Sequence, residues 1–161
     1  MQLHRMRPVV VVGTVVVLDQ TTKWLVRQTF PCEGSGFVVV PGLFDLCYIR
    51  NIGAAWGVLS GWQAFLIAFS LAAMALLVWR RHTLLGDLPL RWLVLGLLIG
   101  GISGNLIDRV WLQYVVDFLY FHWGPHYFPA FNVADSSICV GVGLFILLQW
   151  REERRRKSAA T

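Results

Sequence analysis

The stretch that decides the fold is residues 100–136, which reads GGISGNLIDRVWLQYVVDFLYFHWGPHYFPAFNVADS. Within it, Asp117 and Asp135 each stand alone among apolar residues and lie close in sequence to long hydrophobic segments. A carboxylate is costly in such surroundings and is normally retained only for a purpose. Asp117 and Asp135 are therefore the first candidate functional residues.

The composition predicts a membrane protein with room for a single compact unit. Of the 161 residues, 57% are hydrophobic and 14% are charged, which is too apolar for a soluble domain of this size. The formal net charge is +5, and the basic residues gather at positions 5–7, 80–81 and 151–157, beside apolar segments. Such clusters are typical of topology signals, so we expect both termini to be cytoplasmic and no nucleic-acid partner.

Hydrophobic runs predict an all-α membrane protein in one domain, residues 1–161. Two external segments separate the apolar runs. Residues 29–60 are rich in β-branched residues around a Pro41-Gly42 turn, which predicts a small extracytoplasmic β hairpin or half-barrel. Residues 111–130 are aromatic, and we expect an external loop or short helix there. The four expected transmembrane helices are residues 8–28, 62–79, 90–109 and 131–150.

The third expected helix carries two stripes. The first is a small-residue stripe at four-residue intervals, which predicts close packing against another helix. The second is polar, and its amide lies one turn inside the helix end, where it needs a partner. We interpret the polar stripe as the wall of a site, although interfacial residues at a helix end would account for part of it. The first stripe is Gly96, Gly100 and Gly104, and the second is Gly101, Asn105 and Asp108, with Arg109 one turn beyond Asn105.

The expected topology brings polar residues from distant parts of the chain to one depth, near the external leaflet. One interpretation is structural, with each acid paired to Lys23, Arg50 or Arg109, and with Asp19 and Lys23 forming an ion pair four residues apart. The convergence itself favours a functional site. The residues concerned are Asp19, Asn51, Asn105, Arg109, Asp117, Asn132 and Asp135.

Two carboxyls close together in a low-dielectric site share one proton, so one can act as base and the other as acid. Such a pair can activate water and cleave an amide without a nucleophilic serine, a metal or any other cofactor. Asn51, Asn105, Asn132 and Arg109 are available to hold a peptide backbone. The sequence leaves open which acid begins as the base.

Other interpretations remain open on the residues alone. Intramembrane acids also mark proton-coupled transporters, but no duplicated half is visible here. A structural scaffold would explain the glycines and leave the two acids without a role. Cys32 and Cys47 share one external segment and are either bonded or free, whereas Cys139 is expected to pack inside a helix.

Five blocks of sequence are spread along most of the chain: DQTTK at 19–23, NIGAAW at 51–56, GGISGNLIDR at 100–109, VVDF at 115–118 and FNVADS at 131–136. In this order they resemble those of the bacterial lipoprotein signal peptidases, the membrane aspartyl proteases also called signal peptidase II. This sequence departs from the usual pattern of that family at Trp56, where phenylalanine is more common, and at Ile102, where a small residue is common.

The resemblance implies a hydrolase of the bacterial inner membrane with its active site near the outer leaflet. Its substrate would be a prolipoprotein, cut just before a diacylglyceryl-modified cysteine, and its external segments would move when substrate binds. We expect the enzyme to contact membrane lipid and to act as a monomer. The implied roles are catalysis for Asp117 and Asp135, substrate binding for Asn51, Gly101, Asn105, Arg109 and Asn132, and support for Asp19 and Lys23.

Overall fold

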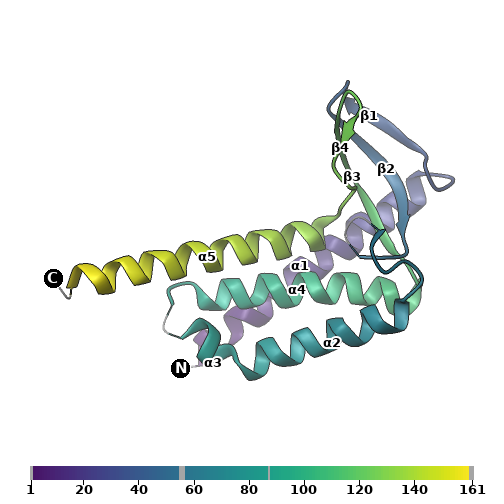
Figure 1. Ribbon diagram of the computed structural model, residues 1–161. Helices are drawn as coiled ribbons and strands as arrows, with labels where there is room; N and C mark the ends of the chain where they lie inside the picture. The colour runs from purple at the N-terminus through teal and green to yellow at the C-terminus, as the bar shows by residue number, and fades with distance from the viewer. Residues whose placement is uncertain (1, 55–56, 87, 160–161) are drawn as a thin grey trace.

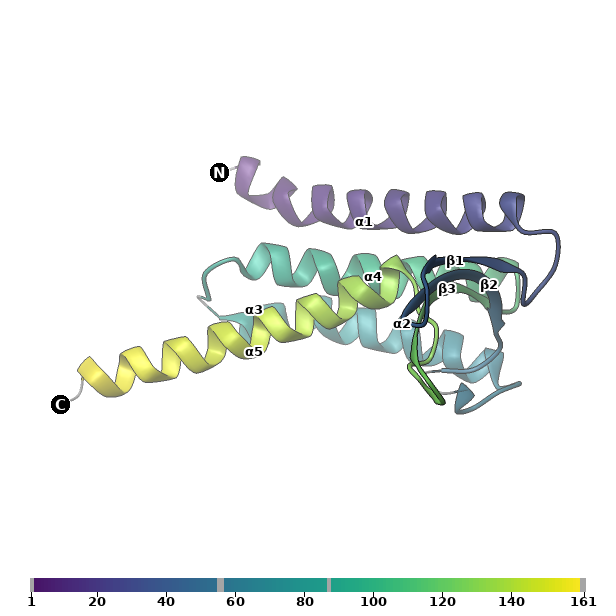
Figure 2. The ribbon, with the colours of Figure 1, turned by 90° about the horizontal axis from the view of Figure 1, so that it is seen from above.

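The computed structural model describes residues 2–54, 57–86 and 88–159, so Trp56 of the second block and Asp87 lie outside the described residues. Four long helices form a bundle in which α4 packs against α1, α2 and α5, and a five-residue helix, α3, follows α2 (Figures 1 and 2). The beginning of α1 and the end of α5 lie at the same end of this bundle. The helices are α1 (Gln2–Thr29), α2 (Gln63–Trp79), α3 (Arg81–Leu85), α4 (Arg91–Trp111) and α5 (Val133–Ala159).

Three of these helices are long and apolar enough to cross a membrane: residues Met6–Thr29, Arg91–Trp111 and Val133–Ser158. The α2 helix is apolar, but its 17 residues extend only about 26 Å. That length is somewhat less than the roughly 30 Å hydrocarbon core of a bilayer. The expected count of four spans is therefore met for three helices, and the fourth span stays a prediction.

A four-stranded antiparallel sheet in the order β1-β2-β3-β4 projects sideways from one end of the bundle (Figure 1). The hairpin expected in residues 29–60 is confirmed as β1 and β2. The loop or short helix expected in residues 111–130 is wrong, because β-branched and aromatic residues there pair with the second edge of β2. The strands are β1 (Gly36–Val40), β2 (Phe44–Asn51), β3 (Val115–Trp123) and β4 (His126–Tyr127).

The small-residue stripe of α4 is confirmed as a packing face. A Cβ atom built on Gly96 would lie 2.6 Å from the Cβ of Val11, and one on Gly100 would lie 2.8 Å from the Cβ of Val15. Real Cβ atoms do not approach other atoms this closely, so only glycine lets α1 and α4 lie at this separation. The close approach places the polar residues of the two helices in direct contact.

We expect Gly101→Ala to lower the melting temperature of the purified protein. A Cβ at Gly101 would lie 2.5 Å from the carbonyl oxygen of Ala134 and 2.7 Å from Cγ1 of Ile138. Because a backbone atom of α5 would have to move, we expect a loss of about 1–3 kcal/mol. Gly143→Ala is the matched control, since nothing lies within 4 Å of its Cβ position. Equal melting temperatures for the two variants would contradict this account of the α4–α5 contact.

All three cysteines are free thiols. Cys32 is exposed and Cys47 is half-buried. The sequence left open whether these two cysteines form a disulfide, and in the structure they do not. Cys139 is exposed on α5, and the expectation that it packs inside a helix is wrong.

Candidate active site

Asp117 lies in β3, opposite Ile49 of β2, and only 2% of its surface is exposed. Its two carboxylate oxygens each accept a side-chain hydrogen bond. Asn51 donates from Nδ2 to Oδ2 over 2.9 Å, and Asn132 donates from Nδ2 to Oδ1 over 2.7 Å. Burial, followed by repulsion from Asp135, raises the pKa of Asp117 to about 7, and the two amide donors oppose this rise. Asp117 is therefore a group that can hold a proton near neutral pH.

Asp135 lies in the first turn of α5, where it forms a reciprocal capping arrangement with Asn132. The backbone N–H of Asn132 donates to Oδ2 of Asp135 over 3.2 Å, and the backbone N–H of Asp135 donates to Oδ1 of Asn132 over 2.9 Å. Asn105 donates from Nδ2 to the other oxygen of Asp135 over 2.7 Å. Because Asn132 bonds both acids, Asp117 and Asp135 face one site.

The three asparagine amides are oriented by donors to their side-chain oxygens. Oδ1 of Asn51 accepts from the backbone N–H of Gly53 over 2.9 Å, and Oδ1 of Asn105 accepts from Lys23 Nζ over 2.9 Å. Oδ1 of Asn132 accepts from the α5 backbone, as described above. With each oxygen occupied by a donor, each amide NH2 group must point to a carboxylate. The acids are therefore held by fixed donors rather than by side chains that can turn.

Behind Asn105 lies a buried ion cluster between α1 and α4. Lys23, 2% exposed, places Nζ 2.8 Å from Oδ2 of Asp19 and 3.0 Å from Oδ2 of Asp108. The other oxygen of Asp19 accepts from the backbone N–H of Ala134 over 2.8 Å, which ties α1 to the start of α5. The ion pair expected between Asp19 and Lys23 is confirmed, and it extends to a third residue.

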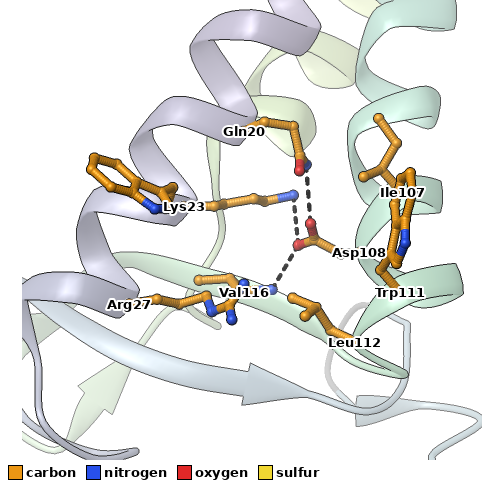
Figure 3. A pocket seen from close by; sticks show the side chains of 9 residues that line it. Gln20, Lys23, Arg27, Ile107, Asp108, Trp111, Leu112 and Val116 are labelled. Atoms are coloured by element: carbon orange, nitrogen blue, oxygen red, sulfur yellow. Dashed lines mark hydrogen bonds and ion pairs between the residues drawn. The ribbon is translucent and has the colours of Figure 1, made fainter.

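Asp108 connects this cluster to the strand that carries Asp117. Its Oδ2 also accepts from the backbone N–H of Val116 over 3.0 Å, and its Oδ1 accepts from Gln20 Nε2 over 3.0 Å. Figure 3 shows Gln20 and Lys23 reaching from α1 toward Asp108, with Val116 on its other side. Sequence reasoning placed Asp108 in the polar stripe of the site wall but missed its link to β3, and it assigned no role to Gln20, although both residues fall within the recognised blocks.

Arg109 is the one predicted site residue in the described part of the chain that has a buried polar side-chain atom without a hydrogen-bond partner. Its Nη2 donates to the carbonyl oxygen of Gly53 over 3.2 Å, which links α4 to the segment after β2. Its Nε is buried and has no hydrogen-bond partner among the described residues. A buried guanidinium nitrogen without an acceptor is costly, so Arg109 is suited to receive an acceptor from a ligand.

Two cavities meet at Asp135. One has a volume of about 440 Å³ and brings together most of the predicted site residues. The other, about 470 Å³, is lined mainly by apolar residues of α2, α4 and α5, and it shares Asn105, Arg109 and Asp135 with the first. Gly101 is buried at the α4–α5 contact, beside the site, and Asn132 lies behind the two acids. The first cavity is lined by Asn51, Ala54, Asn105, Arg109, Val115, Asp117, Phe128, Pro129, Ala130, Phe131, Asp135, Ser136, Ile138 and Cys139.

The family model described as signal peptidase (SPase) II matches residues 11–151 of this chain, which is most of its length. The chain belongs to the signal peptidase II family. Its similarity to curated members covers nearly the full length of both partners. A lipoprotein signal peptidase of Syntrophotalea carbinolica is 42% identical over 98% of this chain and 100% of its own. One of Geobacter metallireducens is 47% identical over 91% of this chain and 92% of its own.

Solved structures agree with this membership. A bacterial membrane enzyme determined by the in meso method at 2.3 Å resolution has a TM-score of 0.80 and 33% sequence identity to this chain. The similarity covers 93% of this chain and 90% of the other. The chain therefore shares its fold with a bacterial membrane enzyme and belongs to a family of peptidases.

Proposed function

We propose that this membrane peptidase is an aspartyl endopeptidase. It removes the signal peptide from diacylglyceryl-modified prolipoproteins by cutting before the lipidated cysteine with an Asp-activated water. The observation that carries the proposal is that Asn132 hydrogen-bonds both Asp117 and Asp135, so the two buried acids border one cavity. The relatives are named lipoprotein signal peptidases, which supports this substrate class.

The surroundings of the two acids favour different roles. Asp135 lies at the N-terminus of α5, where the helix dipole and a backbone N–H stabilise a carboxylate. Asp117 lies in a strand, and its raised pKa of about 7 keeps a proton on it near neutral pH. Asp135 is then the base that starts the reaction, and Asp117 is the acid. This assignment is part of the proposal, since the sequence leaves open which acid begins as the base.

The reaction follows from these roles. Asp135 takes a proton from water, the hydroxide oxygen bonds to the scissile carbonyl carbon, and Asp117 gives its proton to the carbonyl oxygen. The proton now on Asp135 passes to the amide nitrogen, and the carbon–nitrogen bond breaks. A hydroxyl proton of the intermediate returns to Asp117 as the new carboxyl group forms. Both acids regain their starting states, and one water has been consumed.

The remaining predicted residues hold the substrate or the acids. Arg109, with its unpartnered Nε, binds a carbonyl oxygen of the substrate, while Asn51 and Asn105 orient the acids at the cavity wall. The larger, mainly apolar cavity accepts hydrophobic parts of the substrate, and Gly101 lets α4 and α5 approach beside it. Asp19 and Lys23 support the site from behind through Asn105.

We place the whole chain, as a single domain, in the bacterial inner membrane as a monomer with α2 as a fourth, short span. Both termini are cytoplasmic, and the active site is near the outer leaflet, where acyl chains of a lipidated cysteine lie. The support is that α1 begins and α5 ends at one end of the bundle, while the acids and the sheet are at the other. The sheet and the segment between β2 and α2 are the parts we expect to move when substrate binds.

The experiment that tests the function is cleavage of a purified prolipoprotein by the detergent-purified enzyme. The substrate is supplied with and without the diacylglyceryl group on its cysteine. We expect cleavage of the lipidated form alone, at the bond before the cysteine, as identified by mass spectrometry of the products. Equal cleavage of both forms would reject the lipid requirement. Proton flux in liposomes without any cleavage would favour a transporter.

We expect the activity to fall as the pH rises above about 7. Asp117 must be protonated to act as the acid, and its pKa is raised to about 7 by burial and by the nearby Asp135. Above that pH the pair carries two negative charges and has no proton to give to the carbonyl oxygen. The measurement is kcat/KM for the lipidated prolipoprotein between pH 5 and 9. Activity that keeps rising through pH 9 would contradict the role of Asp117.

A further inference from the structure

A third cavity, of about 400 Å³, lies between α1 and α4 and shares no lining residue with the two cavities at the acids. It opens near the ends of both helices, where α1 stops at Thr29 and α4 stops at Trp111. Both helices are long and apolar enough to span, so their ends lie at headgroup depth. The cavity is lined by Gln20, Lys23, Trp24, Arg27, Ile107, Asp108, Trp111, Leu112 and Val116.

The polar side chains at the floor of this cavity already have hydrogen-bond and ion-pair partners. Lys23 and Asp108 form an ion pair at 3.0 Å, and Gln20 donates to Asp108 over 3.0 Å. Figure 3 shows these three side chains meeting at the centre of the view, with Arg27 and Trp111 toward the helix ends. The polar atoms of the floor are therefore already bonded to one another, and a ligand would find its polar partners nearer the opening.

Three donors surround the opening. Arg27 has no hydrogen bond or ion pair with any residue in the described part of the chain, and the same holds for the indole N–H groups of Trp24 and Trp111. Trp24 is 57% exposed and Trp111 is 78% exposed. Beside these donors, Ile107 and Leu112 supply apolar surface. Unpaired donors next to an apolar wall suit a ligand that combines an anion with a hydrocarbon chain.

Arg27 is one of two guanidinium groups that lie near Tyr114. Burial and a hydrogen bond with Tyr48 raise the pKa of the nearby Tyr114, and Arg50 and Arg27 both oppose this rise. The positive charges of Arg50 and Arg27 thus both favour the ionised form of the Tyr114 phenol. Glu33 is the acid close to Arg50, whose backbone N–H donates to Glu33 Oε1 over 3.3 Å.

We propose that this cavity binds the phosphate of an anionic phospholipid from the outer leaflet. Arg27 pairs with the phosphate, and the acyl chains lie along Ile107 and the rings of Trp24 and Trp111. Guanidinium groups match phosphate oxygens with two parallel hydrogen bonds, and tryptophan is enriched at the depth of lipid headgroups. The phospholipid phosphate is the abundant anion at this depth, and it brings the hydrocarbon that the wall requires.

The test uses the full-length protein in a neutral detergent, with native mass spectrometry to count bound lipid. Dioleoylphosphatidylglycerol, dioleoylphosphatidylcholine and inorganic phosphate are titrated separately into the wild type and Arg27→Gln. We expect one tight phosphatidylglycerol per wild-type chain, and an affinity about tenfold weaker in Arg27→Gln. Saturation of the same site by inorganic phosphate alone, or equal affinity for the zwitterionic lipid, would overturn the proposal.

The matched control is Arg80→Gln. The Arg80 guanidinium also lies against a tryptophan, 4.5 Å from the ring centre of Trp79, but it lines none of the three cavities described here. We expect this variant to bind the tight phosphatidylglycerol as the wild type does. An equal loss in Arg80→Gln and Arg27→Gln would show general attraction to basic surface and would overturn the site.

Trp111→Phe separates the indole donor from the ring, because phenylalanine keeps an aromatic surface without the N–H group. We expect phosphatidylglycerol affinity to fall by about threefold to tenfold in this variant, with the melting temperature of the lipid-free protein unchanged. Unaltered affinity in both Trp111→Phe and Arg27→Gln would rule out the cavity as the place where lipid binds.

Discussion

We expect Asp117→Asn and Asp135→Asn each to reduce the cleavage rate of the lipidated prolipoprotein by about 10³-fold or more. General acid–base steps contribute on the order of 10²–10⁴-fold, and here two such steps depend on one shared proton. Asparagine keeps nearly the same volume but can neither take a proton from water nor give one to the carbonyl oxygen. The measurement is single-turnover cleavage, followed by separation of the signal peptide from the mature lipoprotein.

Asp45→Asn is the control for this pair. Asp45 lies on β2 with Oδ2 3.1 Å from Nε2 of His122, and it lines neither cavity at the acids. We expect this variant to cleave at nearly the wild-type rate. Circular dichroism and thermal melting establish that the two site variants are folded. A folded Asp117→Asn or Asp135→Asn enzyme that keeps wild-type turnover would reject the paired-acid mechanism.

We expect Lys23→Met to destabilise the protein by about 3–5 kcal/mol, which is the usual cost of removing one partner from a buried ion pair. In the wild type, Lys23 Nζ lies 2.8 Å from Asp19 and 3.0 Å from Asp108. The substitution leaves both carboxylates buried without their cation. It also removes the donor that fixes the amide of Asn105, so we expect cleavage to be lost as well. The measurement is thermal unfolding of the purified protein in detergent.

The control for Lys23 is Lys157→Met, in the exposed basic end of α5. An exposed lysine contributes little to stability, so we expect its melting temperature to match the wild type. If Lys23→Met melted at the wild-type temperature, the ion cluster would not be what holds α1 and α4 together. Loss of cleavage at an unchanged melting temperature would instead leave Lys23 only its role in orienting Asn105.

The sequence was sufficient where one local signal determines the structure. Apolar runs located the helices, and the Pro41-Gly42 turn between β-branched residues identified the β1–β2 hairpin. The glycine stripe of α4 indicated a helix contact without naming α1 as the partner. These features depend on neighbouring residues in the chain and on the period of the pattern.

The rest required contacts that are far apart in sequence. The strand β3 forms because β2 offers it a free edge, and no pattern within residues 111–130 states which edge is available. The link between Asp108 and the backbone of Val116 is similarly invisible, since Asp108 reads equally well as an interfacial helix end. The orientation of each asparagine amide follows from donors on other elements, which only the assembled fold supplies.

The two acids belong to different parts of the molecule, because Asp117 is carried by the projecting sheet and Asp135 by the helix bundle (Figure 1). Any tilt of the sheet would change the distance between Asp117 and Asp135. A small rigid-body displacement of the sheet relative to the helix bundle would thus keep an enzyme without substrate inactive, with every helix and strand intact. Binding of the substrate against the sheet would then bring the two acids to their working distance, so that only a bound substrate is cleaved.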